Sequence, residues 1–324
     1  MDESDTNLPP DMLEAIEDCY ERCNAIVQNY AHKLDAQPAP AIVYHYTDSA
    51  GLLGILESGT IRLTDMFGLN DPSELRHGIS RACEILTVET QLGHPAATIF
   101  AEKFNRIMNG GVEAVAHFFA GCLSRASDDL GQWRAYGDDG RGFAIGFDGG
   151  LLDKAFIRRG DEDIPGNATF PVTYDDKLLR EMHQKLVGVV IPLIAMPAGR
   201  NLGNAAINRF MKELSVNFSV CVIRAAIFFK HEAYANEQEY RLLKILEAHQ
   251  SIDGLRRRAR RFALTRFTEF DWKSKGHHVL RKIVIGPAAD ERAARSFTHE
   301  CLRAAGFDPT MVIICQSKIP YRCA

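Results

Sequence analysis

The chain has 324 residues, of which 46% are hydrophobic and 25% charged, which is typical of a globular protein with enough apolar material for a large core. A net charge of −4 and an isoelectric point of about 6.3 argue against a general nucleic-acid binder, although a local basic patch is compatible with both values. The eight cysteines form no CxxC pair and no Cys/His grouping with zinc spacing, which argues against the common structural zinc motifs.

The sequence predicts a cytoplasmic protein that does not enter a membrane. The first five residues are acidic and lack the apolar stretch of a secretory signal. No segment approaches the roughly 18 consecutive apolar residues that a membrane-spanning helix needs. Cys122 and Cys315 lie within apolar runs, so we expect both to be small buried hydrophobic residues in a reduced environment.

The first predicted element is an amphipathic helix from Asp11 to about Leu34. Its apolar residues recur every three or four positions, at Leu13, Ile16, Tyr20, Cys23, Val27 and Tyr30. We expect this face to pack on its own domain, on a second subunit or on an antitoxin-like partner. A proline-containing linker ends the helix and divides the chain into an N-terminal tail, helix and linker (1–40) and a single domain (41–324).

The domain opens with a strand over 41–47, a helix over 49–58 and a second strand over 60–64. In the segment Asn70–Glu74, Asp71 is a candidate N-cap and Pro72 suits the first helical position. Helical sequence then covers 74–90 and 96–108, which together form a helical insert at about 74–110. A second helical insert, with a Pro/Gly break, covers about 175–222.

The remaining pattern is rich in strands, which are predicted over 117–124, 142–148, 168–174, 224–230, 239–246, 281–285 and 311–315. These strands mostly neighbour one another along the chain, and the helices are grouped before and between them. The pattern therefore predicts an α+β fold rather than an alternating doubly wound sheet.

His45 and Thr47 form the first candidate site. Side chains two positions apart in a strand share a face, so both can point at one ligand at the end of the first strand. Such a pair can hydrogen-bond a sugar hydroxyl or another polar group. The alternative is a core histidine whose ring is satisfied by a backbone carbonyl.

Glu237, Glu239 and Arg241 form the second candidate site. The two-residue period of a strand places all three on one face. A carboxylate at a strand mouth can position a sugar hydroxyl, stabilise an oxocarbenium ion or act as a general base. The alternative is a solvated edge with an internal Glu–Arg pair. A metal role is less favoured, because no third carboxylate stands at a diagnostic spacing.

Two further segments contain residues suited to a nucleotide. In 132–141, Trp133 and Tyr136 offer flat surfaces for a base or nicotinamide ring, and Arg134 and Arg141 can pair with phosphate oxygens. The alternative is a hairpin loop whose aromatics cover the core, and the glycine pattern is neither Walker nor Rossmann. The basic run 255–261 is expected to be a solvated helix face, with a nucleic-acid contact as the alternative.

Six segments together resemble a widespread bacterial domain family of unknown function. They are His45–Thr47, Asn70–Glu74, Gln132–Tyr136, Gly142–Phe147, Glu237–Arg241 and Ser317–Arg322. The resemblance runs from about residue 42 to 322 and leaves the first helix outside.

His45-Tyr46-Thr47, followed by a helix that closes on glycine, is also similar to the opening of ADP-ribosyltransferases of the diphtheria-toxin and poly(ADP-ribose) polymerase type. The likeness implies a split, mixed or antiparallel β-sheet sandwich with an NAD cleft. It implies that His45 and Thr47 hold NAD, and that Glu239 or Glu237 is the catalytic glutamate. Tyr136 and Tyr46 both remain candidates for the aromatic that stacks on nicotinamide, since 142–147 lacks the tyrosine of that family.

The resemblance therefore implies an NAD-consuming ADP-ribosyltransferase or NAD glycohydrolase, with an unknown protein or nucleic-acid acceptor and a role as a toxin or phage-defence effector. Two alternatives remain open. One is a non-catalytic module that senses a nucleotide or a nucleic-acid end. The other is a metal-dependent nuclease that uses Asp71, Glu74, Glu237 and Glu239.

Overall fold

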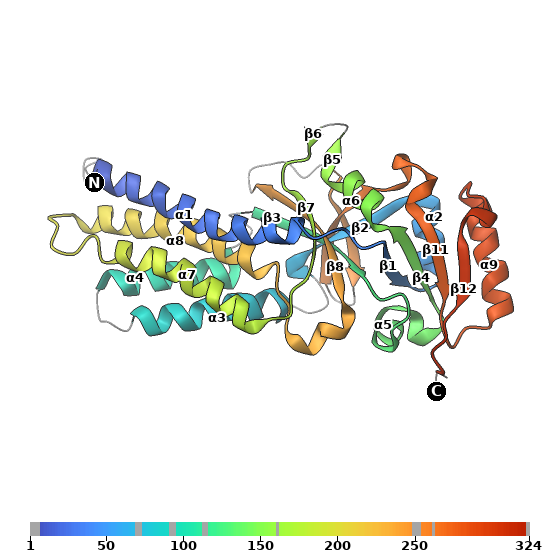
Figure 1. Ribbon diagram of the computed structural model, residues 1–324. Helices are drawn as coiled ribbons and strands as arrows, with labels where there is room; N and C mark the ends of the chain where they lie inside the picture. The colour runs from blue at the N-terminus through green and yellow to red at the C-terminus, as the bar shows by residue number, and fades with distance from the viewer. Residues whose placement is uncertain are drawn as a thin grey trace.

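The computed structural model describes residues 7–68, 73–90, 95–111, 116–159, 162–247, 254–260 and 263–321. In this part of the chain, five long helices lie alongside one another at one end of the molecule, and a large mixed sheet with helices α2, α5, α6 and α9 occupies the other end (Figure 1). The fold is thus α+β, as the order of the predicted elements indicates.

The helical end is formed by α1 (Pro10–Asp35), α3 (Ser73–Thr90), α4 (Pro95–Arg106), α7 (Asp176–Ile194) and α8 (Asn204–Ala226). Aromatic rings from two of these helices fill its centre, where Phe100 and Phe104 of α4 pack on Phe218 of α8. The predicted helical conformation of 74–90, about 96–108 and about 175–222 is confirmed. Asn70, Asp71 and Pro72 lie outside the described residues, and α3 begins directly after them.

Most of the predicted apolar stripe of α1 is covered by the same chain, but Leu13 and Tyr20 of that stripe are exposed. Met12, Cys19, Cys23 and Val27 are buried against α7 and α8 in the core of the bundle. The first helix therefore packs on its own chain, which is one of the three arrangements that its sequence allows. A partner of α1 stays a prediction, and it would have to contact the exposed face of α1, which contains Leu13 and Tyr20 beside its polar residues.

The large sheet contains ten strands: β1 (Ile42–Thr47), β2 (Thr60–Asp65), β3 (Ala116–Ser124), β4 (Phe143–Asp148), β7 (Asn167–Pro171), β8 (Glu239–Glu247), β9 (Arg256–Arg260), β10 (Ala263–Asp271), β11 (Leu280–Ile285) and β12 (Ile313–Gln316). Their main order is β12-β11-β4-β1-β3-β2-β10-β9, and β8 joins β3 to β7. The pairing of β11 with β12 is parallel, whereas the other pairings are antiparallel. A separate ribbon joins β5 (Arg158–Arg159) to β6 (Glu162–Asp163).

The sheet divides at β3. One edge of β3 pairs with β8 along the whole strand, from Ala116 to Ser124. The opposite edge is shared, because β1 pairs with it at Ser124 and β2 pairs with it at Phe119 and Ala120. Beyond β3, β1 and β2 diverge, and the sheet opens between them.

Helix α2 (Ser49–Ser58) connects the two diverging strands. The Asp48 carboxylate accepts a hydrogen bond from the Gly51 N–H (2.6 Å) and starts the helix, and Gly59 ends it in the left-handed conformation (φ 67°). Gly51 is required here, because a Cβ atom would overlap the Thr47 hydroxyl. The predicted helix over 49–58 that closes on glycine is confirmed.

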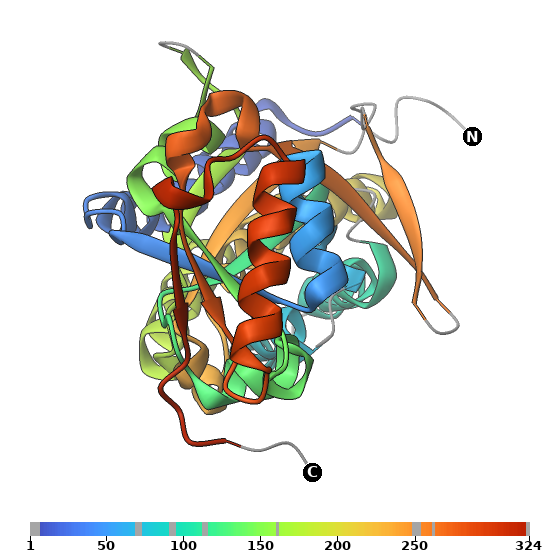
Figure 2. The ribbon, with the colours of Figure 1, turned by 90° about the vertical axis from the view of Figure 1, so that its right-hand side faces the viewer.

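Three helices cover the sheet away from the bundle: α2, α6 (Gly149–Ile157) and α9 (Glu291–Ala304). Figure 2 shows α9 beside α2 in front of the sheet, and the β9–β10 ribbon extends to one side. Trp272, Phe147 and Phe307 form an aromatic cluster beneath them. The shorter helical segments are α5 (Leu130–Tyr136), η2 (Met66–Gly68), η3 (Ile107–Gly111), η5 (Asp138–Gly140), η6 (Glu232–Glu237), η7 (Lys273–Lys275), η8 (His277–Val279) and η9 (Pro309–Met311).

Several predicted elements are wrong. The segment 224–230 is not a strand: α8 runs to Ala226, and only Phe229 forms a bridge, to Thr173. Short apolar runs do not distinguish a buried helix from a strand, and this one is buried on all sides. The basic run is strand β9 rather than a helix face, because it pairs along β10, which was not predicted. The segment 132–136 is helix α5 rather than a hairpin loop.

Among the described residues, no helix is both long enough and apolar enough to cross a bilayer.

His183 makes the stability of the bundle sensitive to acid. Its side chain lies on α7 with 0% exposure, and neither ring nitrogen has a hydrogen-bond partner among the described residues. Burial lowers the pKa of His183 to about 4 from 6.5, and Asp176 only partly opposes the effect. Between pH 4 and 6.5 the unfolded chain binds more protons at this histidine than the folded chain does, so stability is lost as the pH falls from about 6.5 toward 4.

We predict that the free energy of unfolding falls by about 1.4 kcal/mol per pH unit in this window, and that His183→Leu removes the loss. Urea denaturation at pH 7, 6, 5 and 4.5 measures the effect. His32→Leu, on the exposed face of α1, is the control and keeps the wild-type slope. Equal slopes for His183→Leu and the wild type would contradict the assignment.

Candidate ligand-binding pocket

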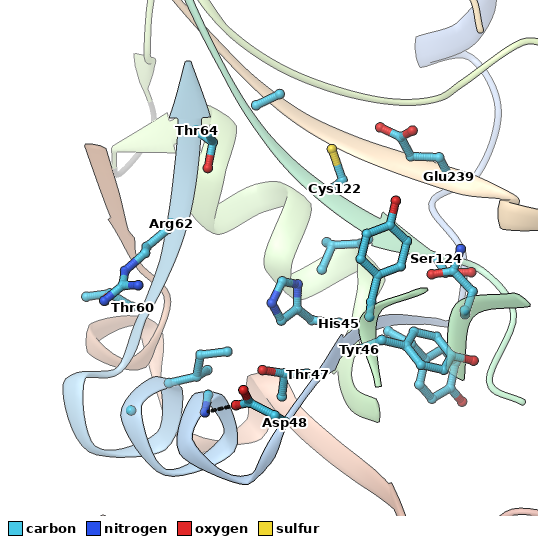
Figure 3. A pocket seen from close by; sticks show the side chains of 18 of the residues that line it. His45, Tyr46, Thr47, Asp48, Thr60, Arg62, Thr64, Cys122, Ser124 and Glu239 are labelled. Atoms are coloured by element: carbon cyan, nitrogen blue, oxygen red, sulfur yellow. Dashed lines mark hydrogen bonds between the residues drawn. The ribbon is translucent and has the colours of Figure 1, made fainter. Parts of the chain in front are cut away.

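A cavity of about 780 Å³ lies where the sheet divides. It is bounded by β1, β2, β3, the start of β8, one face of α2 along its length, α5 and the outer strands β9 and β10. Figure 3 shows side chains from β1, β2, β3 and β8 around one open space. Volumes of 300–1,000 Å³ are typical of small-molecule sites, so a molecule the size of a dinucleotide can be accommodated.

Six of the eight predicted site residues, from three separate segments of the sequence, line this cavity. His45, Tyr46 and Thr47 line it from β1, and Tyr136 lines it from α5. Glu237 and Glu239 line it from the opposite side. The three segments are separated by long stretches of sequence and meet only because β1 and β8 flank β3.

His45 points into the cavity and is half-buried (Figure 3). Burial lowers the pKa of His45 below its usual 6.5, while a hydrogen bond with the Cys122 backbone partly opposes this shift. The ring is therefore neutral at pH 7, with one nitrogen that donates and one that accepts. A neutral imidazole is suited to positioning a hydroxyl or amide group of a ligand.

Tyr46 has a structural role in addition to its place in the wall. Its hydroxyl donates to the Ala126 carbonyl (2.9 Å) and accepts from the Asp129 N–H (3.3 Å), and burial raises its pKa. Its ring packs edge-on against Trp133, with the ring centroids 4.7 Å apart. These contacts fix the connection between β3 and α5 beside the cavity.

Trp133 and Arg134 do not line the cavity, contrary to the expectation that they bind the ligand. Trp133 has 0% exposure and lies behind Tyr46, where its indole N–H donates to Asp128 (2.8 Å). Arg134 is exposed on α5. Because α5 is a helix, Tyr136 is the aromatic of this segment that faces the cavity, and its hydroxyl lies 3.4 Å from the Glu237 carboxylate.

Asp128 connects two of the six segments that carry the family resemblance, Gln132–Tyr136 and Ser317–Arg322. Its carboxylate accepts from the Trp133 indole, from the Ser317 hydroxyl (2.6 Å) and from the Lys318 N–H (2.9 Å). The C-terminal segment is thereby fastened to the loop before α5. These residues support the cavity wall, and their contacts are structural.

Glu239 is the most deeply buried acid of the site, with 3% exposure. Its Oε1 atom accepts from Arg241 (2.7 Å), and its Oε2 atom lies 3.3 Å from Lys230 Nζ. Burial alone would raise the pKa of Glu239, but Arg241 and Lys230 outweigh it, so the pKa is lowered. Glu239 is therefore a carboxylate at pH 7 despite its burial.

Lys230 connects the two acids. Its ammonium group lies 2.6 Å from Glu237 Oε2 as well as near Glu239, and it packs over the Tyr234 ring at 4.7 Å. Arg241 also donates to the Ile227 carbonyl (2.8 Å) just after α8. Two acids and two cations thus form one buried cluster, defined here as the charged cluster of Lys230, Glu237, Glu239 and Arg241.

The sequence predicts that Glu237 lies in the same strand as Glu239, but Glu237 reaches the cavity from a turn before that strand. It ends η6, and Gln238 then adopts a left-handed conformation (φ 44°) before β8 begins at Glu239. The Ser124 hydroxyl donates to the Glu237 carbonyl (2.7 Å) and holds this turn to β3. The strained Gln238 backbone lets both neighbouring carboxylates face one space.

Sequence reasoning missed several cavity residues, among them Lys230, Cys122 and Arg62. Lys230 directly follows a buried apolar run, and a lysine in that place is the signal that could have revealed it. Cys122 was expected to be buried, but it is exposed and lines the cavity, because β3 presents it where β1 and β2 diverge. Cys315 is partly buried.

The nuclease alternative has little support from the donor set. Asp71 and the side chain of Glu74 lie outside the described part of the structure. Glu237 and Glu239 face Lys230 and Arg241, which compete with a metal ion for the carboxylate oxygens. In the described part of the chain, no group of three or more His, Cys, Asp or Glu side chains is arranged to hold a metal.

Residues 132–242 match a family model described as "Protein of unknown function (DUF2971)". The match runs from α5 into β8, so it includes Tyr136, Lys230, Glu237 and Glu239 of the cavity. The likeness to a domain family of unknown function is confirmed over that segment. No curated protein and no solved structure matches the chain.

We predict that Glu239→Gln lowers the free energy of unfolding by about 3 kcal/mol, because it leaves Arg241 and Lys230 buried with too little negative charge. Glu237→Gln is the matched control. Its side chain is more accessible, at 14% against 4%, so we expect a loss of about 1 kcal/mol. Urea denaturation at pH 7 distinguishes the two, and equally small losses would contradict the central place of Glu239.

Proposed function

We propose that the protein binds NAD in this cavity and breaks the bond between nicotinamide and ribose, transferring ADP-ribose to a macromolecule or to water. One observation supports the proposal most strongly: His45 and Thr47 line the same cavity as Glu237 and Glu239. The resemblance of the His45–Thr47 segment to ADP-ribosyltransferases suggests that this combination serves NAD.

The reaction needs little beyond positioning and electrostatics. The C–N bond breaks, its electron pair leaves with the nicotinamide nitrogen, and positive charge develops on the ribose. An acceptor oxygen or nitrogen then bonds to the ribose carbon and loses a proton. A fixed carboxylate, a stacked nicotinamide and hydrogen bonds to the ribose lower this barrier.

The cavity residues suit these roles. We assign His45 and Thr47 to hydrogen bonds with the ribose and the nicotinamide amide, and Tyr136 to stacking, since the Tyr46 hydroxyl is already bound to backbone groups. Arg241 and Lys230 keep Glu239 ionised and immobile, which suits a group that stabilises positive charge without taking a proton.

Glu237 is better placed than Glu239 to receive the acceptor proton. It is the more exposed of the two acids, and it lies beside the Tyr136 hydroxyl at the cavity mouth. In this scheme Glu239 provides fixed charge and Glu237 provides general-base catalysis, which contributes about 10²–10⁴-fold in enzymes. An enzyme of this kind would deplete NAD, as a toxin or a phage-defence effector does.

A non-catalytic nucleotide sensor is the second candidate. The observation in its favour is that Lys230 and Arg241 compensate the charge of both acids, which reduces the field that a developing cation would experience. A sensor would use the same cavity and the same His45 and Thr47 contacts, and it would release the ligand unchanged.

We predict that the purified protein releases nicotinamide from NAD, measured by chromatography with and without cell lysate or nucleic acid. His45→Ala and Glu239→Gln should each lower the rate at least about 100-fold, because the first removes a hydrogen bond to the ribose and the second removes the negative charge that stabilises the developing cation. His32→Ala, on the exposed face of α1, is the control and keeps full activity.

Other outcomes decide between the alternatives. Tight NAD binding without nicotinamide release would show that the protein is a sensor and not an enzyme. Cleavage of nucleic acid that requires Mg²⁺ or Mn²⁺, with NAD unchanged, would show that it is a nuclease. Unchanged nicotinamide release by His45→Ala and Glu239→Gln would show that the reaction does not take place in this cavity.

A further inference from the structure

One wall of the cavity carries arginines that the proposed chemistry does not use. Thr60, Arg62 and Thr64 alternate along β2 and face the cavity, whereas Ile61 and Leu63 point into the core with 2% and 1% exposure (Figure 3). Arg256 and Arg258 alternate in the same way along β9 and line the same space. We call Arg62, Arg256 and Arg258 the arginine wall.

Register places the arginine wall on one continuous surface. Glu269 of β10 is opposite Arg62 of β2, and Phe267 of β10 is opposite Arg256 of β9. The Arg62 guanidinium packs over the Phe267 ring at 5.0 Å. This contact positions the Arg62 side chain, which lines the cavity, and a guanidinium over a ring can still donate hydrogen bonds in its own plane.

The charges of the cavity are segregated. In the charged cluster, two acids balance two cations. On the β2–β10–β9 side, the lining residues that the structure describes include the three arginines of the wall and one carboxylate, Glu269, which lies 3.1 Å from Arg256. Among these described residues positive charge predominates, although the whole chain has a net charge of −4.

We propose that the arginine wall is a pyrophosphate-binding subsite, so that the ligand of this cavity carries a phosphoanhydride between the ribose held near His45 and a second group beyond β2. A diphosphate bridge carries two negative charges and several acceptor oxygens, which the three guanidinium groups can neutralise and bind, while Glu269 opposes its binding. The identification of the ligand as NAD rests on the proposed function, whereas the diphosphate chemistry rests on the arginine wall.

The position of the arginines favours a small ligand over nucleic acid. Arg62, Arg256 and Arg258 line a cavity that β1, β3 and α2 also enclose. Arg257, between two members of the wall, does not line the cavity and is paired in register with Arg266. Binding of a duplex would instead require a continuous basic outer surface.

Isothermal titration with ADP and with inorganic pyrophosphate tests the subsite, because neither ligand contains the bond that the proposed reaction breaks. We expect Arg62→Ala, Arg256→Ala and Arg258→Ala each to weaken ADP binding about tenfold, and the triple variant about 100-fold or more. Arg257→Ala, on the same strand but outside the cavity, is the matched control and leaves the affinity unchanged.

Glu269→Gln is expected to change the ADP affinity in the opposite direction to the arginine variants. It removes the carboxylate of this wall, so it should strengthen ADP binding several-fold, a result that a misfolded protein cannot produce. Circular dichroism confirms that each variant is folded. This increase, together with the losses for the three arginine variants, would support the subsite.

Two results would overturn the proposal. One is an ADP affinity that does not change in the triple arginine variant. The other is weakened binding of a single-stranded oligonucleotide in the arginine variants while ADP binding is unaffected. Failure of the proposed function is a separate result. If NAD binds through these arginines but is not cleaved, the proposed enzymatic function is wrong and the subsite is supported. If NAD is cleaved and the arginine variants keep their ADP affinity, only the subsite proposal is wrong.

Discussion

The pairing of Glu239 with Arg241 and Lys230 is the interaction on which the cavity depends. A carboxylate with 3% exposure is tolerated only when opposite charges and hydrogen bonds surround it, because removing each ion from water costs several kcal/mol. The partners come from different parts of the chain: Arg241 from β8, and Lys230 from the segment that follows α8. Arg241 also binds the Ile227 carbonyl, so the same cluster joins the helical bundle to the sheet.

The division of the sheet at β3 turns this cluster into one side of a binding site. β8 occupies one edge of β3, and β1 and β2 share the other, so Cys122 of β3 stands between His45 and Glu239 (Figure 3). His45 bonds to the Cys122 backbone, and the Cys122 side chain bonds to Glu239. The cavity can therefore present a neutral imidazole, two fixed carboxylates and an arginine wall to a single ligand.

Much of the fold could be predicted from the sequence, because its elements have strong local signals. The strand ending at His45, the helix capped by Asp48 and Gly59, and both helical inserts follow from periodicity and capping. The buried end of α8 and strand β9 were misread, since an apolar run and an arginine run have no decisive period. His45, Thr47 and the two acids were identified because polar residues interrupt apolar strands. The arginine wall was missed, because Arg62 and Arg256 are brought together by strand pairing that the sequence does not reveal. Lys230 was missed although a lysine directly after a buried apolar run is visible in the sequence.

A crystal structure of the protein soaked with ADP-ribose and nicotinamide would show whether the two parts of NAD together span the divided sheet. The account predicts nicotinamide against Tyr136, the adjacent ribose within hydrogen-bond distance of His45 and Thr47, and the diphosphate on the arginine wall. It would be contradicted by an empty cavity at millimolar ligand. Binding instead in the second cavity, of about 360 Å³, which Pro38, Thr169 and Tyr240 line, would contradict it equally.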